Sequence, residues 1–218
     1  MINKLIIDSS DSFTDLCKLG ADYRTDKSPY LSPLSPYFSE PGEHGHAYSA
    51  VYDFLFSSIR FKKIKLAEIG IQFCKSIEVF REYFPNSEIY GFESHLPYLE
   101  DAPKKNIPGT SYFHIDVANP SSIIQAMNNC NQKFDIIIDD SSHVFEHQIL
   151  LISLIHEYMN PGGIFIIEDL WLNTPDSQWE TSIEPYKHYY SNITFVEPKH
   201  KYQFSGDWKN DKLIVLYK

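Results

Sequence analysis

FDIIIDDSSHVFEHQILLISLIHEYMNPGGIFIIED, residues 134–169, has the pattern of a strand, a helix and a second strand. Residues 134–140 and 163–169 are apolar runs that end in acidic residues, and apolar residues recur at helical spacing through 146–159. A Pro-Gly-Gly triplet separates the helix from the second strand. Because strands joined through one helix are usually parallel neighbours, this stretch predicts a parallel sheet.

The same alternation continues on both sides of this unit. Five more segments have strand patterns, at residues 65–70, 88–93, 111–116, 193–198 and 212–218. A helical pattern covers 75–84, and the last two strands are suited to a hairpin at the end of the sheet. The expected fold is α/β: a Rossmann-like, mostly parallel seven-stranded sheet with helices on both faces.

The first 64 residues are less regular than the rest. Residues 29–41 are rich in proline, which disfavours regular elements and suits a loop or lid. We expect residues 1–64 to form a helical and loop-rich N-terminal cap. Residues 65–218 would then form the ligand-binding part of one structural domain.

Composition limits the classes of partner. The 218 residues carry a formal net charge of −10, which argues against nucleic acid or an anionic membrane as the main partner. The cysteines Cys17, Cys74 and Cys130 have no paired spacing, so neither a disulfide framework nor a thiolate zinc site is indicated. With no signal-peptide pattern and no apolar run of membrane-spanning length, we expect a cytoplasmic protein.

The first three strands of the βαβ series end in residues that suit a ligand. Glu68 and Gly70 end the first, Glu93 the second and Asp116 the third. The carboxyl ends of strands in an open parallel sheet form the rim where ligands bind, and a carboxylate there can accept hydrogen bonds from a ribose diol. Since the G-x-G-x-x-G pattern is absent, NAD is disfavoured. Capping of the next helix is the competing explanation for each carboxylate.

Three carboxylates are expected to meet where two neighbouring strands end. Asp140 ends one strand, and Glu168 and Asp169 end the next. Carboxylates that close repel each other unless they bind a cation, and an all-oxygen set favours magnesium, manganese or calcium. His143 follows Asp140 by three residues and is a candidate general base. The alternative is that these residues are helix caps or solvated loop residues.

A zinc site is a second interpretation of the same stretch. His143-Val-Phe-Glu146-His147 has the H-x-x-E-H spelling of an inverted zinc peptidase motif. That motif needs both histidines on one face of a helix, plus a third ligand. Here His143 belongs to a strand-to-helix loop, so we expect Glu146 and His147 to be residues of the helix surface.

The E-x-G pattern and the acidic strand ends resemble a class I S-adenosylmethionine-dependent methyltransferase. The usual family form is E-x-G-x-x-x-G-x-S; here Cys74 replaces the second glycine and Ser76 remains. The resemblance implies S-adenosylmethionine as cofactor. The cofactor-binding residues would be Glu68, Gly70, Glu93, Ser94, Asp116 and Asp139.

The stretch 134–171 resembles a narrower group. IIIDDSSHVFEHQ and PGGIFIIEDLW are similar to the D-D-G-S-H and P-G-G-x-x-x-I-E-D signatures of the metal-dependent sugar O-methyltransferases of macrolide biosynthesis and of the cephalosporin-hydroxylase-like family, with Ser141 in place of glycine. The resemblance implies His143 as the base and Mg²⁺ or Mn²⁺ held by Asp140, Glu168 and Asp169. Residues 25–27 and 46–48 resemble the T-D-K and H-x-Y segments that help close the cofactor pocket in the same relatives.

The expected function is therefore Mg²⁺-assisted O-methylation of a hydroxyl on a sugar or other small natural product. A glycoside is the expected acceptor, with residues 171–190 and 29–41 as candidate acceptor walls and lid. A homo-oligomer stays open. The alternatives are a non-methylating enzyme with the same cofactor and metal, an inactive scaffold of the same fold and, more remotely, a zinc peptidase.

Overall fold

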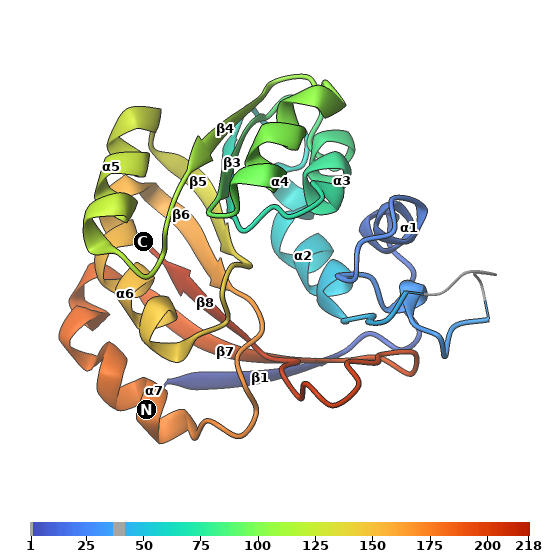
Figure 1. Ribbon diagram of the computed structural model, residues 1–218. Helices are drawn as coiled ribbons and strands as arrows, with labels where there is room; N and C mark the ends of the chain where they lie inside the picture. Colours follow the sequence, from blue (N-terminus) through green and yellow to red (C-terminus); the bar gives the residue numbers. More distant parts are fainter. Residues whose placement is uncertain (1, 37–41) are drawn as a thin grey trace.

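One eight-stranded sheet organises the molecule (Figure 1). The computed structural model describes residues 2–36 and 42–218. The strand order is β1-β7-β8-β6-β5-β2-β3-β4, and only β8 runs antiparallel to its neighbours. The strands are β1 (Asn3–Asp8), β2 (Lys65–Ile69), β3 (Glu88–Glu93), β4 (Thr110–His114), β5 (Phe134–Asp139), β6 (Met159–Ile167), β7 (Asn192–Lys199) and β8 (Leu213–Tyr217).

The seven predicted strands are all present, and an eighth was missed. Residues 3–8, expected in the helical and loop-rich cap, form β1, which pairs in parallel with β7 at the edge of the sheet. An edge strand has only one partner and needs little apolar surface: Leu5 is 50% exposed and Ile6 58%. The pairing of β7 with β8 is confirmed as antiparallel, but β1, not the hairpin, ends the sheet.

The start of β6 also differs from the prediction. The Pro-Gly-Gly triplet at 161–163 was expected to precede the strand, yet β6 begins at Met159. The register between β5 and β6 shifts at this point, because Phe134 pairs with Met159 and Ile136 with Ile164. The triplet therefore lies in an irregular stretch that bulges from the first part of the strand.

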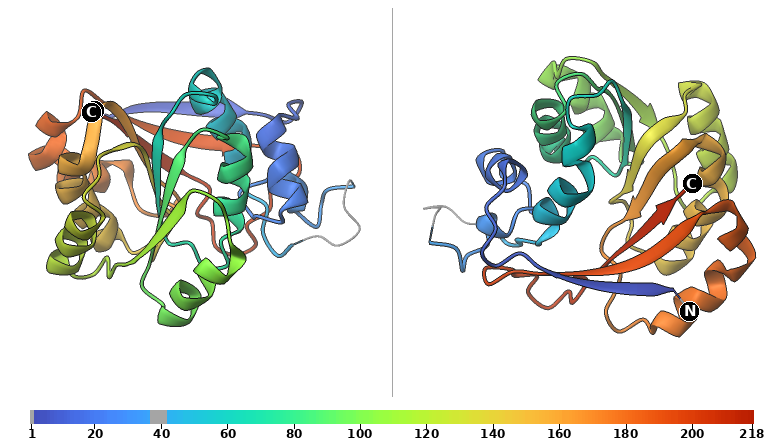
Figure 2. Two further views of the ribbon diagram at one scale, coloured as in Figure 1. Left: turned by 90° about the horizontal axis from the view of Figure 1, so that it is seen from above. Right: turned by 180° about the vertical axis from the view of Figure 1, so that it is seen from behind.

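Helices cover both faces of the sheet (Figures 1 and 2). One face carries α1 (Asp15–Asp22), α2 (Tyr48–Phe56) and α3 (Lys75–Tyr83), and the other carries α5 (Pro120–Cys130), α6 (Phe145–Ile155) and α7 (Asp176–Ile183). The short α4 (Leu96–Asp101) contacts β3 and β4. The 3-10 turns are Pro29–Leu31, Ser57–Ile59, Ala102–Lys105, His156–Tyr158 and Glu184–Tyr189.

Alternation along the central strands builds two cores. In β5, Ile137 packs into the cluster with α5, α6 and α7, whereas Ile136 and Ile138 pack into the cluster with α1, α2 and α3. Successive side chains of a strand point to opposite faces, so a continuous apolar run fits a strand that is covered on both sides. The apolar runs of β2, β5 and β6 thereby specify the centre of the sheet.

The register of these central strands sets the position of the rim. Ile69 pairs with Asp139, which in turn pairs with Ile167. Gly70, Asp140 and Glu168, one residue further on, therefore leave the sheet at the same level. Among the described residues, no helix has the length and apolar character needed to cross a membrane.

Candidate active site

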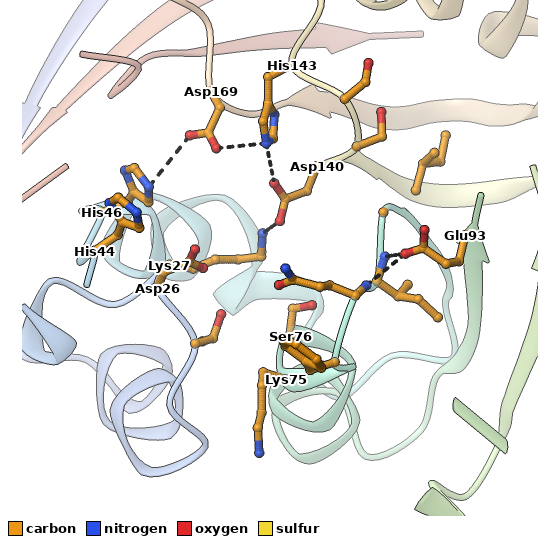
Figure 3. A pocket seen from close by; sticks show the side chains of 18 of the residues that line it. Asp26, Lys27, His44, His46, Lys75, Ser76, Glu93, Asp140, His143 and Asp169 are labelled. Carbon is orange, nitrogen blue, oxygen red and sulfur yellow. Dashed lines mark hydrogen bonds and ion pairs between the residues drawn. The ribbon is translucent and has the colours of Figure 1, made fainter. Parts of the chain in front are cut away.

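A cavity of about 620 Å³ lies at the carboxyl ends of the parallel strands (Figure 3). Its lining includes residues at the ends of five strands or within two residues beyond them: Gly70, Glu93, Ile115, Asp140 and Asp169. This volume falls in the range of small-molecule binding sites. The cavity therefore lies at the edge of the sheet where the sequence analysis predicted ligand-binding residues.

Gly70 allows two loops to meet at the floor of the cavity. Its φ is +90°, and a Cβ placed on it would lie 2.1 Å from the carbonyl oxygen of Asp140. A glycine is thus required here because the backbone after β2 passes very close to the backbone after β5.

Glu93 fixes the shape of the loop that follows β2. Its Oε2 accepts from the backbone amides of Ile71 (3.2 Å) and Gln72 (3.0 Å), and its Oε1 accepts from those of Ser94 (2.9 Å) and His95 (2.8 Å). Glu93 and Ser94 both line the cavity. The carboxylate is therefore held at the cavity wall by four amides from two loops.

Cys74 keeps the backbone conformation of a glycine. It precedes α3 with φ +59° and ψ +22°, the left-handed region that glycine adopts most readily. Its side chain is buried, and burial raises the pKa of the thiol to about 11. The substitution at this position of the family pattern therefore leaves the turn into α3 in place, with an unreactive thiol packed beneath it.

Three of the predicted cofactor residues do not line the cavity. Glu68 is fully buried and accepts from Ser76 Oγ at 2.6 Å; burial raises its pKa to about 7. Asp139 accepts from Ser141 Oγ at 2.5 Å, and burial raises its pKa to about 6. Asp116 is exposed and accepts from the amide of Ala118. Glu68 and Asp139 therefore hold serine side chains next to the cavity, and Asp116 caps the turn that follows it.

Asp140, His143 and Asp169 converge in the part of the cavity between Glu93 and His46 (Figure 3). His143 Nε2 lies 3.9 Å from Asp140 Oδ1 and 3.6 Å from Asp169 Oδ2. One ligand atom from each of the three residues lies within 4.8 Å of the others, close enough to hold one metal ion. His143 and Asp169 both have positive φ, +54° and +57°, and such strained residues cluster at functional sites.

Glu168 points away from this cluster to a buried cation. Lys27 Nζ donates to Glu168 Oε2 at 2.6 Å and to Asp140 Oδ2 at 2.5 Å, and it lies 3.7 Å from Glu68 Oε1. The Tyr52 hydroxyl donates to the other oxygen of Glu168. Burial works against the charge of Lys27, but the carboxylates of Asp140 and Glu168 outweigh it and hold the pKa of Lys27 well above its usual value.

Asp169 is held by residues of the N-terminal segment. The Tyr48 hydroxyl donates to Asp169 Oδ1, and His46 Nε2 lies 3.9 Å from the same oxygen. His46 Nδ1 is 2.7 Å from Asp211. Burial opposes protonation of His46, yet the hydrogen bond with Asp211 and the charge of Asp169 raise its pKa to about 9. The segments that resembled T-D-K and H-x-Y therefore reach the carboxylate cluster itself.

The geometry does not support the zinc-peptidase motif. α6 begins at Phe145, so His143 precedes the helix, and His147 contacts Ser142 Oγ at 2.9 Å. Among the described residues, the cluster close enough to hold a metal contains His143 but neither Glu146 nor His147. The two histidines therefore do not form a pair of ligands on one helical face.

The sequence did not identify several residues around the cluster. Tyr52 is invisible to pattern analysis because it lies 116 residues from its partner Glu168. Trp208 and His44 line the cavity from segments with no motif. Of the aromatic stretch 171–190, Trp179 and Tyr190 are buried, and Trp171 stacks on Trp208. Part of the proposed lid, residues 37–41, lies outside the described residues.

The curated proteins that are similar to this chain include O-methyltransferases. Mycinamicin VI 2''-O-methyltransferase of Micromonospora griseorubida is 27% identical over 154 residues, 66% of this chain and 37% of that protein. Demethylmacrocin O-methyltransferase of Streptomyces fradiae is 27% identical over 155 residues, 67% of this chain and 38% of that protein. The chain thus spans less than two fifths of the length of these curated relatives. No protein-family model matches it.

Solved structures agree on the fold. The methyltransferase MycE of the mycinamycin pathway, solved with Mg and SAH, superposes with a TM-score of 0.66 at 18% identity, over 94% of this chain and 55% of that one. The chain has a methyltransferase fold. The resemblance to class I S-adenosylmethionine-dependent methyltransferases, and to the sugar O-methyltransferases among them, is confirmed.

Proposed function

We propose that this chain is an S-adenosylmethionine-dependent, Mg²⁺-assisted O-methyltransferase acting on a hydroxyl of a sugar or other small natural product. One observation carries the proposal: a single cavity joins the Glu93 wall to the Asp140, His143 and Asp169 cluster. A donor held at one end and a hydroxyl held at the other would meet inside it. Relatives named as sugar O-methyltransferases support the assignment.

The cofactor would occupy the Glu93 end of the cavity. Glu93 would accept hydrogen bonds from a ribose diol in place of some of its four backbone amides, and Ser94 lies beside it on the wall. Gly70 lets the two loops close beneath the cofactor. Glu68 and Asp139 would act indirectly, by holding Ser76 and Ser141, and Asp116 would sit at the outer rim.

The carboxylate cluster fits a divalent cation. Asp140 and Asp169 present oxygens to the cavity around His143, and oxygen donors suit Mg²⁺ or Mn²⁺. Glu168 would join them only by giving up its bond to Lys27. When bound, the cation would supply Lewis acidity, which makes the acceptor hydroxyl more acidic.

The residues of the chain would then position the reactants and move one proton. His143 Nε2 takes the proton of the acceptor hydroxyl, whose oxygen bonds to the methyl carbon of the sulfonium donor. The carbon–sulfur bond breaks and its electron pair stays on sulfur, which leaves S-adenosylhomocysteine and a methyl ether. Holding the two reactants in line contributes most of the rate, because it makes a bimolecular step effectively unimolecular.

A methyl-transfer assay tests this function. The protein is incubated with S-adenosylmethionine and a panel of glycosides, with Mg²⁺ or with EDTA, and product masses are measured. We expect a methylated product in Mg²⁺ that EDTA suppresses. His143→Ala should lower kcat by roughly 10²- to 10⁴-fold without changing affinity for S-adenosylhomocysteine, whereas His147→Ala should be neutral. Equal kcat for His143→Ala and the wild type would refute the role of the base.

A further inference from the structure

The wall opposite the cofactor end contains an exposed tryptophan. In Figure 3, Glu93 lies on one side of Asp140 and His143, and His44 and His46 lie on the other. Trp208 lines the cavity together with His44 and Asn210, and its side chain is 49% exposed. A large apolar ring left open at a cavity wall costs hydrophobic free energy and therefore suggests a ligand surface.

Trp208 is a preorganised flat surface. Its ring stacks on Trp171 with centroids 5.8 Å apart and planes 14° from parallel, and the His44 ring lies nearly perpendicular to it, with centroids 6.0 Å apart. Trp171 Nε1 donates to the carbonyl of His143 at 3.0 Å. The stacked pair is thereby linked directly to the loop that carries the proposed base.

The loop that carries Trp208 is tied down on both sides. Phe204 exchanges two backbone hydrogen bonds with Gly45, and Lys209 accepts from the amide of Leu172 at 2.9 Å. Within the loop, Ser205 Oγ donates to Asp211 at 2.5 Å. The wall is thus fixed before any ligand binds, which reduces the entropic cost of recognition.

Polar groups without partners lie beside this surface. Asn210 is 3% exposed and lines the cavity, and its Oδ1 has no hydrogen-bond partner within the described part of the chain. The same holds for Nδ1 of His44. A buried acceptor left unpaired costs roughly 1–3 kcal/mol, a cost that a ligand hydroxyl would remove once the Asn210 side chain turns its oxygen to the cavity.

The charges that line the cavity are mixed in sign. Asp26, Glu43 and Asp169 are acidic, whereas Arg24 and Lys27 are basic and the pKa of His46 is raised to about 9. A pyranose ring matches the remaining chemistry, because its C–H face suits a flat aromatic ring while its hydroxyls at the edge suit an amide and an imidazole.

We infer that Trp208, backed by Trp171 and flanked by His44 and Asn210, binds the ring of a pyranoside acceptor. The inference rests on the proposed function and assigns its acceptor subsite. The ring stacks on Trp208, and its hydroxyl edge faces Asn210 on one side and the His143 cluster on the other. Specificity for a glycoside over a planar phenol comes from the polar groups around the tryptophan.

Variants of Trp208 test the subsite with methyl α-L-rhamnopyranoside as acceptor and catechol as comparison. Trp208→Ala should raise KM for the pyranoside by about tenfold or more, and Trp208→Phe should raise it less, because it keeps an aromatic face. Affinity for S-adenosylhomocysteine should stay unchanged in both. Phe54→Ala removes an aromatic side chain that is 72% exposed on α2 and should change neither value.

Three results would overturn the subsite while leaving the proposed function standing. They are an unchanged KM for the pyranoside in Trp208→Ala, a preference for catechol, and a wild type that binds S-adenosylhomocysteine but neither binds nor methylates the pyranoside. Binding of the pyranoside is measured by the quenching of tryptophan fluorescence. Loss of S-adenosylhomocysteine binding in the wild type itself would instead refute the proposed function.

Discussion

Gly70 is the residue whose replacement should perturb the site most directly. Gly70→Ala adds a Cβ that would lie 2.1 Å from the carbonyl oxygen of Asp140 at a φ of +90°, so the ends of β2 and β5 must separate. We expect a loss of roughly 2–4 kcal/mol in the free energy of unfolding, from strain and displaced backbone, measured by urea denaturation. Affinity for S-adenosylhomocysteine should fall as well.

The matched control is Gly162→Ala. Gly162 also has a positive φ, +77°, but a Cβ added to it would meet no atom within 4 Å. The free energy of unfolding of this variant should fall by only about 1 kcal/mol, the conformational cost of a positive φ for alanine. Equal destabilisation by the two substitutions would show that contact with Asp140 is not what requires a glycine at position 70.

Lys27 is the internal counter-ion of the carboxylate cluster. Lys27→Met leaves Asp140 and Glu168 without their cation, and loss of one partner of a buried ion pair costs about 3–5 kcal/mol. We expect the melting temperature in EDTA to fall, and Mg²⁺ to raise it more in this variant than in the wild type. The surface substitution Lys18→Met, which breaks an exposed pair with Asp22, should change little. An Mg²⁺ effect equal to that of the wild type would contradict this role.

At this scale the sequence revealed strand ends but not side-chain partners. Asp140, His143 and Asp169 were expected together because their strands are adjacent and end at one level. Lys27 was not expected among them, since it lies 113 residues from Asp140 and reaches it only in the folded chain. For the same reason no pattern could tell that Glu168 turns to Lys27.

At the scale of elements, one charged pair joins the N-terminal segment to the β7–β8 loop. His46 Nδ1 contacts Asp211, and the pKa of His46 is raised from 6.5 to about 9. A raised pKa in the folded state means that this stabilisation is complete below pH 6.5 and is lost as pH rises through 9. Between pH 6.5 and pH 9 the free energy of unfolding should therefore fall by roughly 3 kcal/mol, as the contribution of this pair is lost.

The variant His46→Gln isolates this contribution. Glutamine can still hydrogen-bond to Asp211 but does not titrate, so the difference in unfolding free energy between wild type and variant should shrink from pH 6.5 to 9. Urea denaturation in EDTA at several pH values measures it. Parallel curves across this range would mean that His46 does not hold its proton in the folded protein.

The elements that the sequence predicted best are those with buried apolar runs. The strands β2, β3, β5 and β8 match their predicted ranges to within a residue or two. β1 was missed because its three apolar residues, Leu5 to Ile7, lie between polar ones and find their partner, β7, near the other end of the chain. The early start of β6 was missed because a bulge, not a turn, accommodates the Pro-Gly-Gly triplet.

At the scale of the whole molecule, we propose that residues 1–64 and 65–218 form one structural domain. β1 belongs to the common sheet, and residues of α1 and α2 share a core with α3. The chain should therefore unfold in a single cooperative transition, with circular dichroism and tryptophan fluorescence giving the same midpoint. Two separate midpoints would indicate a cap that unfolds independently.

Binding of S-adenosylmethionine in the cavity beside Glu93 is the basis of the proposed function, and calorimetric titration with S-adenosylhomocysteine measures it. We predict one site per chain in the wild type. Glu93→Gln should weaken binding by about tenfold or more, because a side-chain amide has one accepting oxygen where the carboxylate of Glu93 uses two to hold four backbone amides. A wild-type protein that gives no binding heat and no competition with S-adenosylmethionine would rule out a cofactor site in this cavity.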